Sequence, residues 1–211
     1  MGRALPKAAA LIALLAWVGA GTPGRAELVD ALVGRIDGYA LTWSEIRREI
    51  AIRRLEGRPA AEGAARVVRD AVVRRRLFAA EAERLRLEVS PAEVDAELEA
   101  LATRCNRPPP ELCRLLGLDP EHLRLRQRQE VLARKYLTFR REMTFVSLTE
   151  VLRFIREQGD RLGVEDPLDV RGEVRAYLEE RKFRRELEEW LRKQVQEGRV
   201  ELLPLPAAPT G

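Results

Sequence analysis

The chain has 211 residues, 45% of them hydrophobic and 34% charged, and its 38 Lys and Arg against 34 Asp and Glu give a net charge of +4. One histidine, His122, and two cysteines, Cys105 and Cys113, are too few for a closed zinc site built from these residue types. A hydrolase with a histidine base would have to depend on His122 alone. The many Leu, Val and Ile residues argue against an intrinsically disordered chain.

Residues 1–26 have the layout of a secretory signal peptide. A basic start precedes an apolar run from Ala8 to Ala20, and small and turn-forming residues follow. We expect cleavage between Ala26 and Glu27; the alternative is an uncleaved anchor, although the run is shorter than a membrane span. The leader holds three basic residues and no acidic one, which leaves 35 basic and 34 acidic residues in the mature chain, a net charge of +1.

Two short apolar runs, Leu32–Ile36 and Tyr39–Leu41, flank Asp37-Gly38 and predict a β-hairpin near the mature N-terminus. Asp-Gly tolerates the positive φ angles of a tight two-residue turn. Near the other end, Val200–Leu203 reads as a single strand, and we expect the Pro/Ala tail, 204–211, to be disordered. The sequence predicts that the two ends of the chain pair in one small β-element.

Between these ends, apolar residues recur at helical spacing. Thr42, Ser90 and Ser147 each stand three residues before a glutamate, which predicts three capping boxes. Consecutive prolines predict a loop from Asn106 to Pro110. The last helix carries an apolar stripe that includes Tyr177. The expected helices are 43–56, 60–87, 91–104, 111–116, 120–141, 148–158 and 168–197.

These elements predict a mostly α fold with a small β-element. We expect a single helical domain over residues 27–203, in which an N-terminal module, 27–145, is completed by a closing helix and strand, 168–203. No internal repeat is present.

Three stretches of this pattern resemble a known family. They are the hairpin and helix start, Leu32–Glu45; the short helix, glycine break and long-helix start, Glu111–Leu123; and the closing helix and strand, with Tyr177–Lys182 and Arg199–Leu202. Together they resemble SurA-like periplasmic chaperones, whose N-terminal helical module and C-terminal helix and strand form one body. In that family, parvulin prolyl isomerase domains usually lie between the two parts. Here the intervening segment, Glu142 to Pro167, is too short for such a domain.

The resemblance implies an ATP-independent periplasmic chaperone that binds unfolded outer-membrane or secreted proteins, with no catalytic residues, metal or cofactor. Two alternatives stay open: a prolyl isomerase relative with degenerate activity, and an assembly scaffold dedicated to one exported partner. Apolar residues on short elements are the candidates for client binding, although each could instead belong to the core. They are Leu112, Leu115, Leu116, Leu118, Phe145 and Val146.

The cysteines, the arginines and the histidine are the remaining candidates for chemistry or ligand binding. Export permits a disulfide between Cys105 and Cys113, and the alternative is two free thiols. The arginine runs 74–76 and 124–128 could bind phosphate, but nearby glutamates and the near-balanced charge favour solvated helix faces over a nucleic-acid partner. We expect His122 to be a surface or capping residue. The sequence leaves membrane contact and oligomeric state open.

Overall fold

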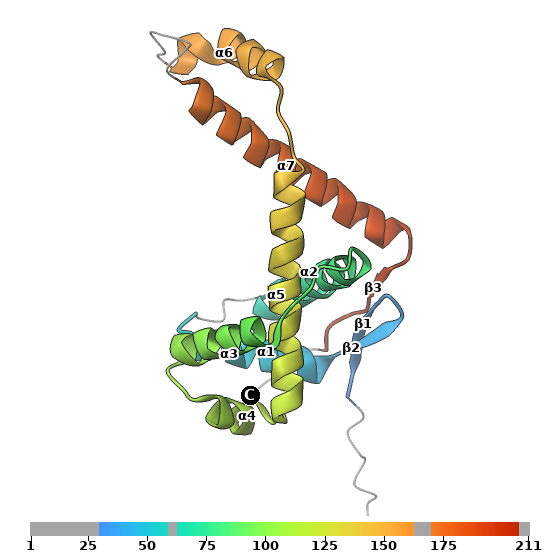
Figure 1. Ribbon diagram of the computed structural model, residues 1–211. Helices are drawn as coiled ribbons and strands as arrows, with labels where there is room; N and C mark the ends of the chain where they lie inside the picture. The colour runs from blue at the N-terminus through green and yellow to red at the C-terminus, as the bar shows by residue number, and fades with distance from the viewer. Residues whose placement is uncertain (1–29, 59–62, 163–169, 207–211) are drawn as a thin grey trace, which may run out of the picture. The chain divides into compact units, whose positions relative to one another are not determined.

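A computed structural model describes residues 30–58, 63–162 and 170–206 (Figure 1). The chain divides into two units, residues 1–30 and 31–211, and all of the elements belong to the second. The predicted signal peptide and its cleavage site at Ala26 and Glu27 lie outside the described residues.

The described residues form seven helices and one three-stranded sheet. The strands are β1 (Leu32–Ile36), β2 (Tyr39–Thr42) and β3 (Val200–Leu202). The helices are α1 (Trp43–Leu55), α2 (Ala64–Arg84), α3 (Pro91–Cys105), α4 (Pro109–Leu116), α5 (Pro120–Glu142), α6 (Leu148–Leu162) and α7 (Arg171–Gln196). This arrangement confirms the predicted fold class, mostly α with a small β-element.

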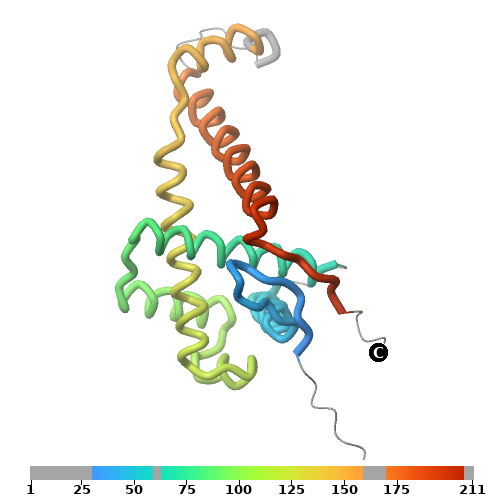
Figure 2. The backbone as a smooth tube through the Cα atoms, turned by 90° about the vertical axis from the view of Figure 1, so that its right-hand side faces the viewer, coloured from blue at the N-terminus to red at the C-terminus, as the bar shows by residue number. Residues whose placement is uncertain are grey.

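The sheet joins the two ends of the unit, as the sequence predicts. Its strand order is β2-β1-β3, and β1 pairs antiparallel with both neighbours (Figures 1 and 2). Asp37 and Gly38, with φ angles of 50° and 82°, make the turn of the hairpin. Gly34 lies opposite Leu202, where a Cβ would come within 2.7 Å of the Glu201 carbonyl oxygen. The close approach of β3 to β1 therefore requires a glycine at this position.

Arg199, just before β3, makes a second connection between the two ends. Its Nε and Nη2 donate to the two carboxylate oxygens of Asp37 at 2.6 and 2.8 Å. Its Nη1 donates to Glu81 in α2 at 2.7 Å and to Gln194 in α7 at 2.5 Å. The hydrogen bonds to Asp37 and Glu81 raise the pKa of Arg199 above its ordinary value. One guanidinium thus holds the hairpin, α2 and α7 together.

The helices pack around several apolar clusters. One lies between the sheet, α1 and α2, and includes Val33, Leu41 and Leu77. Another joins α2, α5 and α7, where the Phe78 ring lies 5.6 Å from Tyr136 and 5.8 Å from Trp190, centroid to centroid. The C-terminal half of α7 is therefore part of the same body as α2 and α5.

Local details differ from the sequence expectations: α2 ends at Arg84 instead of residue 87, and α6 runs to Leu162 instead of residue 158. The Thr42 hydroxyl accepts from the Glu45 amide, but the Glu45 carboxylate binds Arg76 rather than the Thr42 amide, so that capping box is half formed. Helix α4 begins at Pro109 instead of Glu111, because proline fits the first turn of a helix. Leu205 packs against the sheet cluster, so ordered packing extends beyond residue 203 into the predicted tail.

Candidate functional site

Helix α6 and the first half of α7 pack against each other through a small apolar core of their own. Val146, Val151, Ile155 and Val174 are buried in it. Ser147 starts α6 with a complete capping box, in which its hydroxyl accepts from the Glu150 amide at 3.2 Å and its own amide donates to the Glu150 carboxylate at 2.8 Å. These bonds lower the pKa of Glu150 and hold its charge at the helix N-terminus.

A pocket of about 200 Å³ lies between α6 and α7. Val146, Phe154 and Leu178 supply its apolar lining. Its charged lining holds more cations than anions and consists of Glu150, Glu157, Arg153, Arg181, Lys182 and Arg185. We call this feature the α6–α7 pocket.

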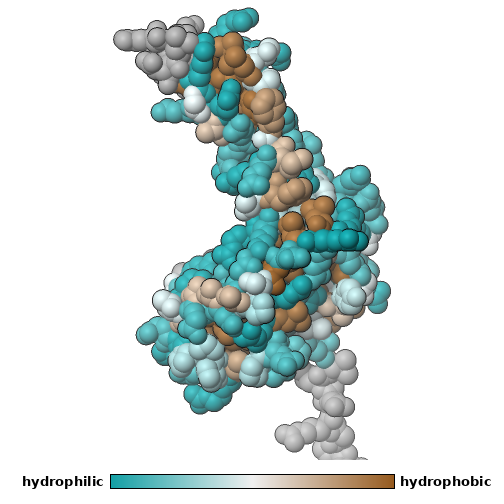
Figure 3. Space-filling model, in the orientation of Figure 1, coloured by the Kyte–Doolittle hydropathy of each residue, from teal (hydrophilic) through white to brown (hydrophobic). Residues whose placement is uncertain are grey.

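Large apolar side chains stand exposed beside this pocket. Met143 and Phe145, in the connection before α6, are each 68% exposed, and Tyr177 is 55% exposed. Leu148, at the start of α6, is also exposed. The Tyr177 ring lies 5.7 Å from the ring of the pocket residue Phe154, and Figure 3 shows hydrophobic atoms at the surface over α6. We call Met143, Phe145, Leu148 and Tyr177 the flanking residues.

A lysine fixes the connection that carries Phe145. Lys182 in α7 donates from Nζ to the Phe145 carbonyl oxygen at 2.7 Å. Val146, the next residue, is buried in the α6–α7 core. The backbone at residues 145 and 146 is therefore anchored on both sides while the Phe145 side chain points into solvent. The Phe145 ring is therefore held at the surface and is not part of the apolar core.

The six client-binding residues proposed from the sequence have different surroundings. Phe145 and Leu115 are exposed, and Leu118 is partly buried. Leu112 and Leu116 are buried in a core cluster, which corrects their proposed role. Val146 is also buried, but it lines the α6–α7 pocket.

The burial in α4 follows from helical spacing. Leu112 and Leu116 stand one turn apart and pack with Ile52, Leu101 and Leu123, while Leu115, at the edge of this face, is half exposed. Shortness of an element was thus a poor guide to exposure.

Sequence reasoning missed Met143, Leu148 and Tyr177. Tyr177 belongs to the apolar stripe of the last helix and would be expected in its core, yet it is exposed. One signal in the sequence could have identified them. The segment of α6 and the connection before it holds many apolar residues, and a single small pair of helices cannot bury all of them.

The predicted disulfide between Cys105 and Cys113 is absent. Both cysteines are free and buried in the cluster that joins α1, α3, α4 and α5. Burial raises the pKa of each thiol, which lowers its reactivity at neutral pH. The two residues act as small apolar core residues.

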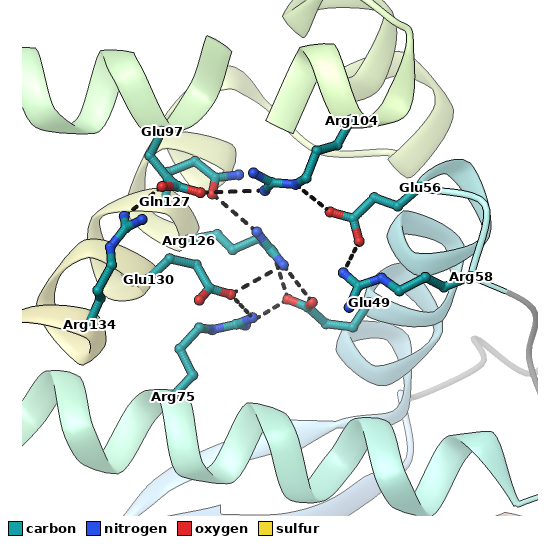
Figure 4. A network of polar contacts seen from close by, with 10 residues as sticks. All are labelled: Glu49, Glu56, Arg58, Arg75, Glu97, Arg104, Arg126, Gln127, Glu130 and Arg134. Atoms are coloured by element: carbon teal, nitrogen blue, oxygen red, sulfur yellow. Dashed lines mark hydrogen bonds and ion pairs between the residues drawn. The ribbon is translucent and has the colours of Figure 1, made fainter. Parts of the chain in front are cut away.

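A buried ion network joins α1, α2 and α5 (Figure 4). Glu49 accepts from Arg75 at 2.6 Å and from two nitrogens of Arg126 at 2.8 Å each. Arg75 also donates to Glu130 at 3.1 Å. Glu49 and Arg75 are both buried. The expectation that these arginine runs form solvated helix faces is therefore wrong for Arg75 and Arg126.

The one histidine does not form part of a further site. Asp119 caps α5 by accepting from the His122 amide at 2.9 Å, and the His122 ring contacts the same carboxylate. His122 is therefore a surface residue of the first turn, one of the two roles that the sequence predicts. In the part of the chain that the structure describes, no three His, Cys, Asp or Glu side chains are grouped to hold a metal ion. No helix among the described residues combines the length and hydropathy that crossing a membrane requires.

Comparisons with known proteins found no matching family model, no similar curated protein and no similar solved structure.

Proposed function

We propose that this protein is an ATP-independent chaperone that binds apolar segments of unfolded polypeptides at the α6–α7 pocket and its flanking residues. The observation that carries the proposal is the exposure of Met143, Phe145 and Tyr177 beside a pocket with an apolar lining. Exposed apolar side chains gathered in one region mark an interaction surface. A small open pocket with flexible side chains suits a weak and adaptable grip.

The proposal places the protein in the periplasm, acting on outer-membrane or secreted precursors. Two sequence features support this location: the signal-peptide layout of residues 1–26 and the resemblance to SurA-like chaperones. The pairing of β1 with β3 agrees with the closing strand of that family. We propose no catalytic step, since binding alone delays aggregation.

Suppression of aggregation tests this function. An unfolded, aggregation-prone protein is diluted into buffer with the purified chain and without ATP, and light scattering is followed. We expect the wild-type chain to slow aggregation of several unrelated clients. The double variant Phe145→Gln/Tyr177→Gln is expected to lose most of this effect, because it removes two exposed rings without disturbing a buried one.

A matched variant separates the site from general surface hydrophobicity. Tyr39→Gln/Val67→Gln also removes one ring and one further apolar side chain, both more than half exposed, from β2 and α2. It should retain wild-type suppression. Equal loss in both double variants, or no suppression by the wild-type chain, would contradict the proposal.

A further inference from the structure

The α6–α7 pocket combines its apolar lining with a surplus of positive charge. Arg153, Arg181, Lys182 and Arg185 line it against two carboxylates, Glu150 and Glu157. The Glu150 carboxylate is occupied by the Ser147 amide and hydroxyl in the capping box. The two carboxylates offset only part of the charge of the four cations, so the pocket keeps a surplus of positive charge.

Two of these cations are exposed at the pocket. They are Arg153, whose charge helps to lower the pKa of Glu150, and Arg181. Arg185 lies 4.0 Å from Glu189, the longest of the ion pairs, and Lys182 donates to a backbone carbonyl. Some other arginines are closely paired, as with Arg199 and Asp37 at 2.6 Å. The pocket is distinguished by having four cations and only two carboxylates in one cavity with an apolar lining.

We infer that the polypeptide segment held by the α6–α7 pocket carries carboxylates next to its apolar side chains. This inference rests on the proposed function and names the client class that the same site selects. Apolar side chains of the segment contact Phe154, Leu178 and the flanking residues, while its Asp and Glu side chains meet Arg153 and Arg181. Charge complementarity of this kind sets partner choice and registration more than total affinity. Arginine suits the role because its planar fork binds a carboxylate through two hydrogen bonds.

Labelled peptides with one apolar core and different flanks test the inference. The core alternates Leu and Phe, and the flanks carry two Glu, two Gln or two Lys; binding to the full chain is followed by fluorescence anisotropy. We expect the Glu-flanked peptide to bind about 3- to 10-fold more tightly than the Lys-flanked one at low salt, because each exposed charge pair contributes modestly. The difference in affinity between the two peptides should shrink in roughly 0.5 M salt, because at that ionic strength charges are screened within a few ångströms.

Two charge-matched variants locate the effect. Arg153→Gln/Arg181→Gln should abolish the preference for Glu flanks over Lys flanks. Arg66→Gln/Arg114→Gln has the same net charge but alters exposed arginines of α2 and α4, and it should keep the preference.

The outcomes separate this inference from the proposed function. Equal binding of all three peptides to the wild-type chain overturns the inference alone, as does a preference that survives in Arg153→Gln/Arg181→Gln. Absence of binding by every peptide overturns the proposed function, and the inference with it.

Discussion

Glu49 occupies a buried position between Arg75 and Arg126, and its charge holds three helices together. Burial raises the pKa of this carboxyl, but the two arginines outweigh burial and lower the pKa to about 2. Removing one member of a buried ion cluster leaves the others uncompensated, which commonly costs about 3 kcal/mol or more. A substitution of Glu49 in α1 therefore also weakens the packing of α2 and α5.

We expect Glu49→Gln to destabilise the fold by about 3 kcal/mol, measured as the free energy of unfolding in urea at pH 7. Glu188→Gln, an exposed position in α7, is the control and should change stability by less than about 0.5 kcal/mol. Similar stability of the two variants would contradict the role assigned to the network.

The same residue predicts a pH dependence. An unfolded glutamate titrates near about 4.3, whereas Glu49 in the folded protein has a pKa of about 2. Its contribution is fully present above the unfolded value and is lost as the pH falls toward 2. The melting temperature of the wild-type chain should therefore fall between about pH 5 and 2 more steeply than that of Glu49→Gln. Parallel pH profiles would be the contrary result.

The β-element depends on contacts between residues far apart in the chain, above all those of Arg199 with Asp37 and Glu81. Arg199→Gln removes the bidentate pair with Asp37 and leaves the buried Glu81 with only one of its two guanidinium partners, Arg84. We expect faster amide hydrogen exchange in β1, β2 and β3 and a stability loss of about 2–4 kcal/mol. Arg192→Gln, at an exposed position of α7, should leave exchange in the sheet unchanged. Unaltered protection of the hairpin in Arg199→Gln would show that the strands hold without this residue.

Elements with local signals could be predicted from the sequence. The Asp37-Gly38 turn, the Ser90 and Ser147 caps and the apolar spacing of the helices act within a few residues, and the structure places hairpin and helices at these positions. Pairing of β1 with β3 was also predictable, because each short apolar strand needs a partner and few strands were available.

Side-chain environments that depend on tertiary packing could not be predicted in this way. Arg75 lies in a run of three arginines, and only the approach of α1 and α5 distinguishes the buried one from its neighbours. Leu112 and Leu115 are both leucines of one short helix, yet Leu112 is fully buried and Leu115 is half exposed. Tyr177 belongs to the apolar stripe of α7, yet it is exposed as well.

At the scale of the whole molecule, the chain separates two roles. The sheet, the ion network and the ring cluster of Phe78, Tyr136 and Trp190 stabilise α1, α2, α5 and the second half of α7. The first half of α7 packs with α6 around a small core, and exposed apolar residues lie beside it. Such a division would let the proposed binding surface stay apolar while the rest of the fold supplies stability.

The central claim is that unfolded clients bind at the α6–α7 pocket, and site-specific photocrosslinking tests it most directly. A photoreactive amino acid is placed at position 145, 177 or 39 of the full chain, which is then mixed with an unfolded client and irradiated. Position 39 is the control because Tyr39 is even more exposed than Phe145 or Tyr177. The account predicts strong client crosslinks from positions 145 and 177 and weak ones from position 39. Equal yields at all three positions, or the highest yield at position 39, would contradict it.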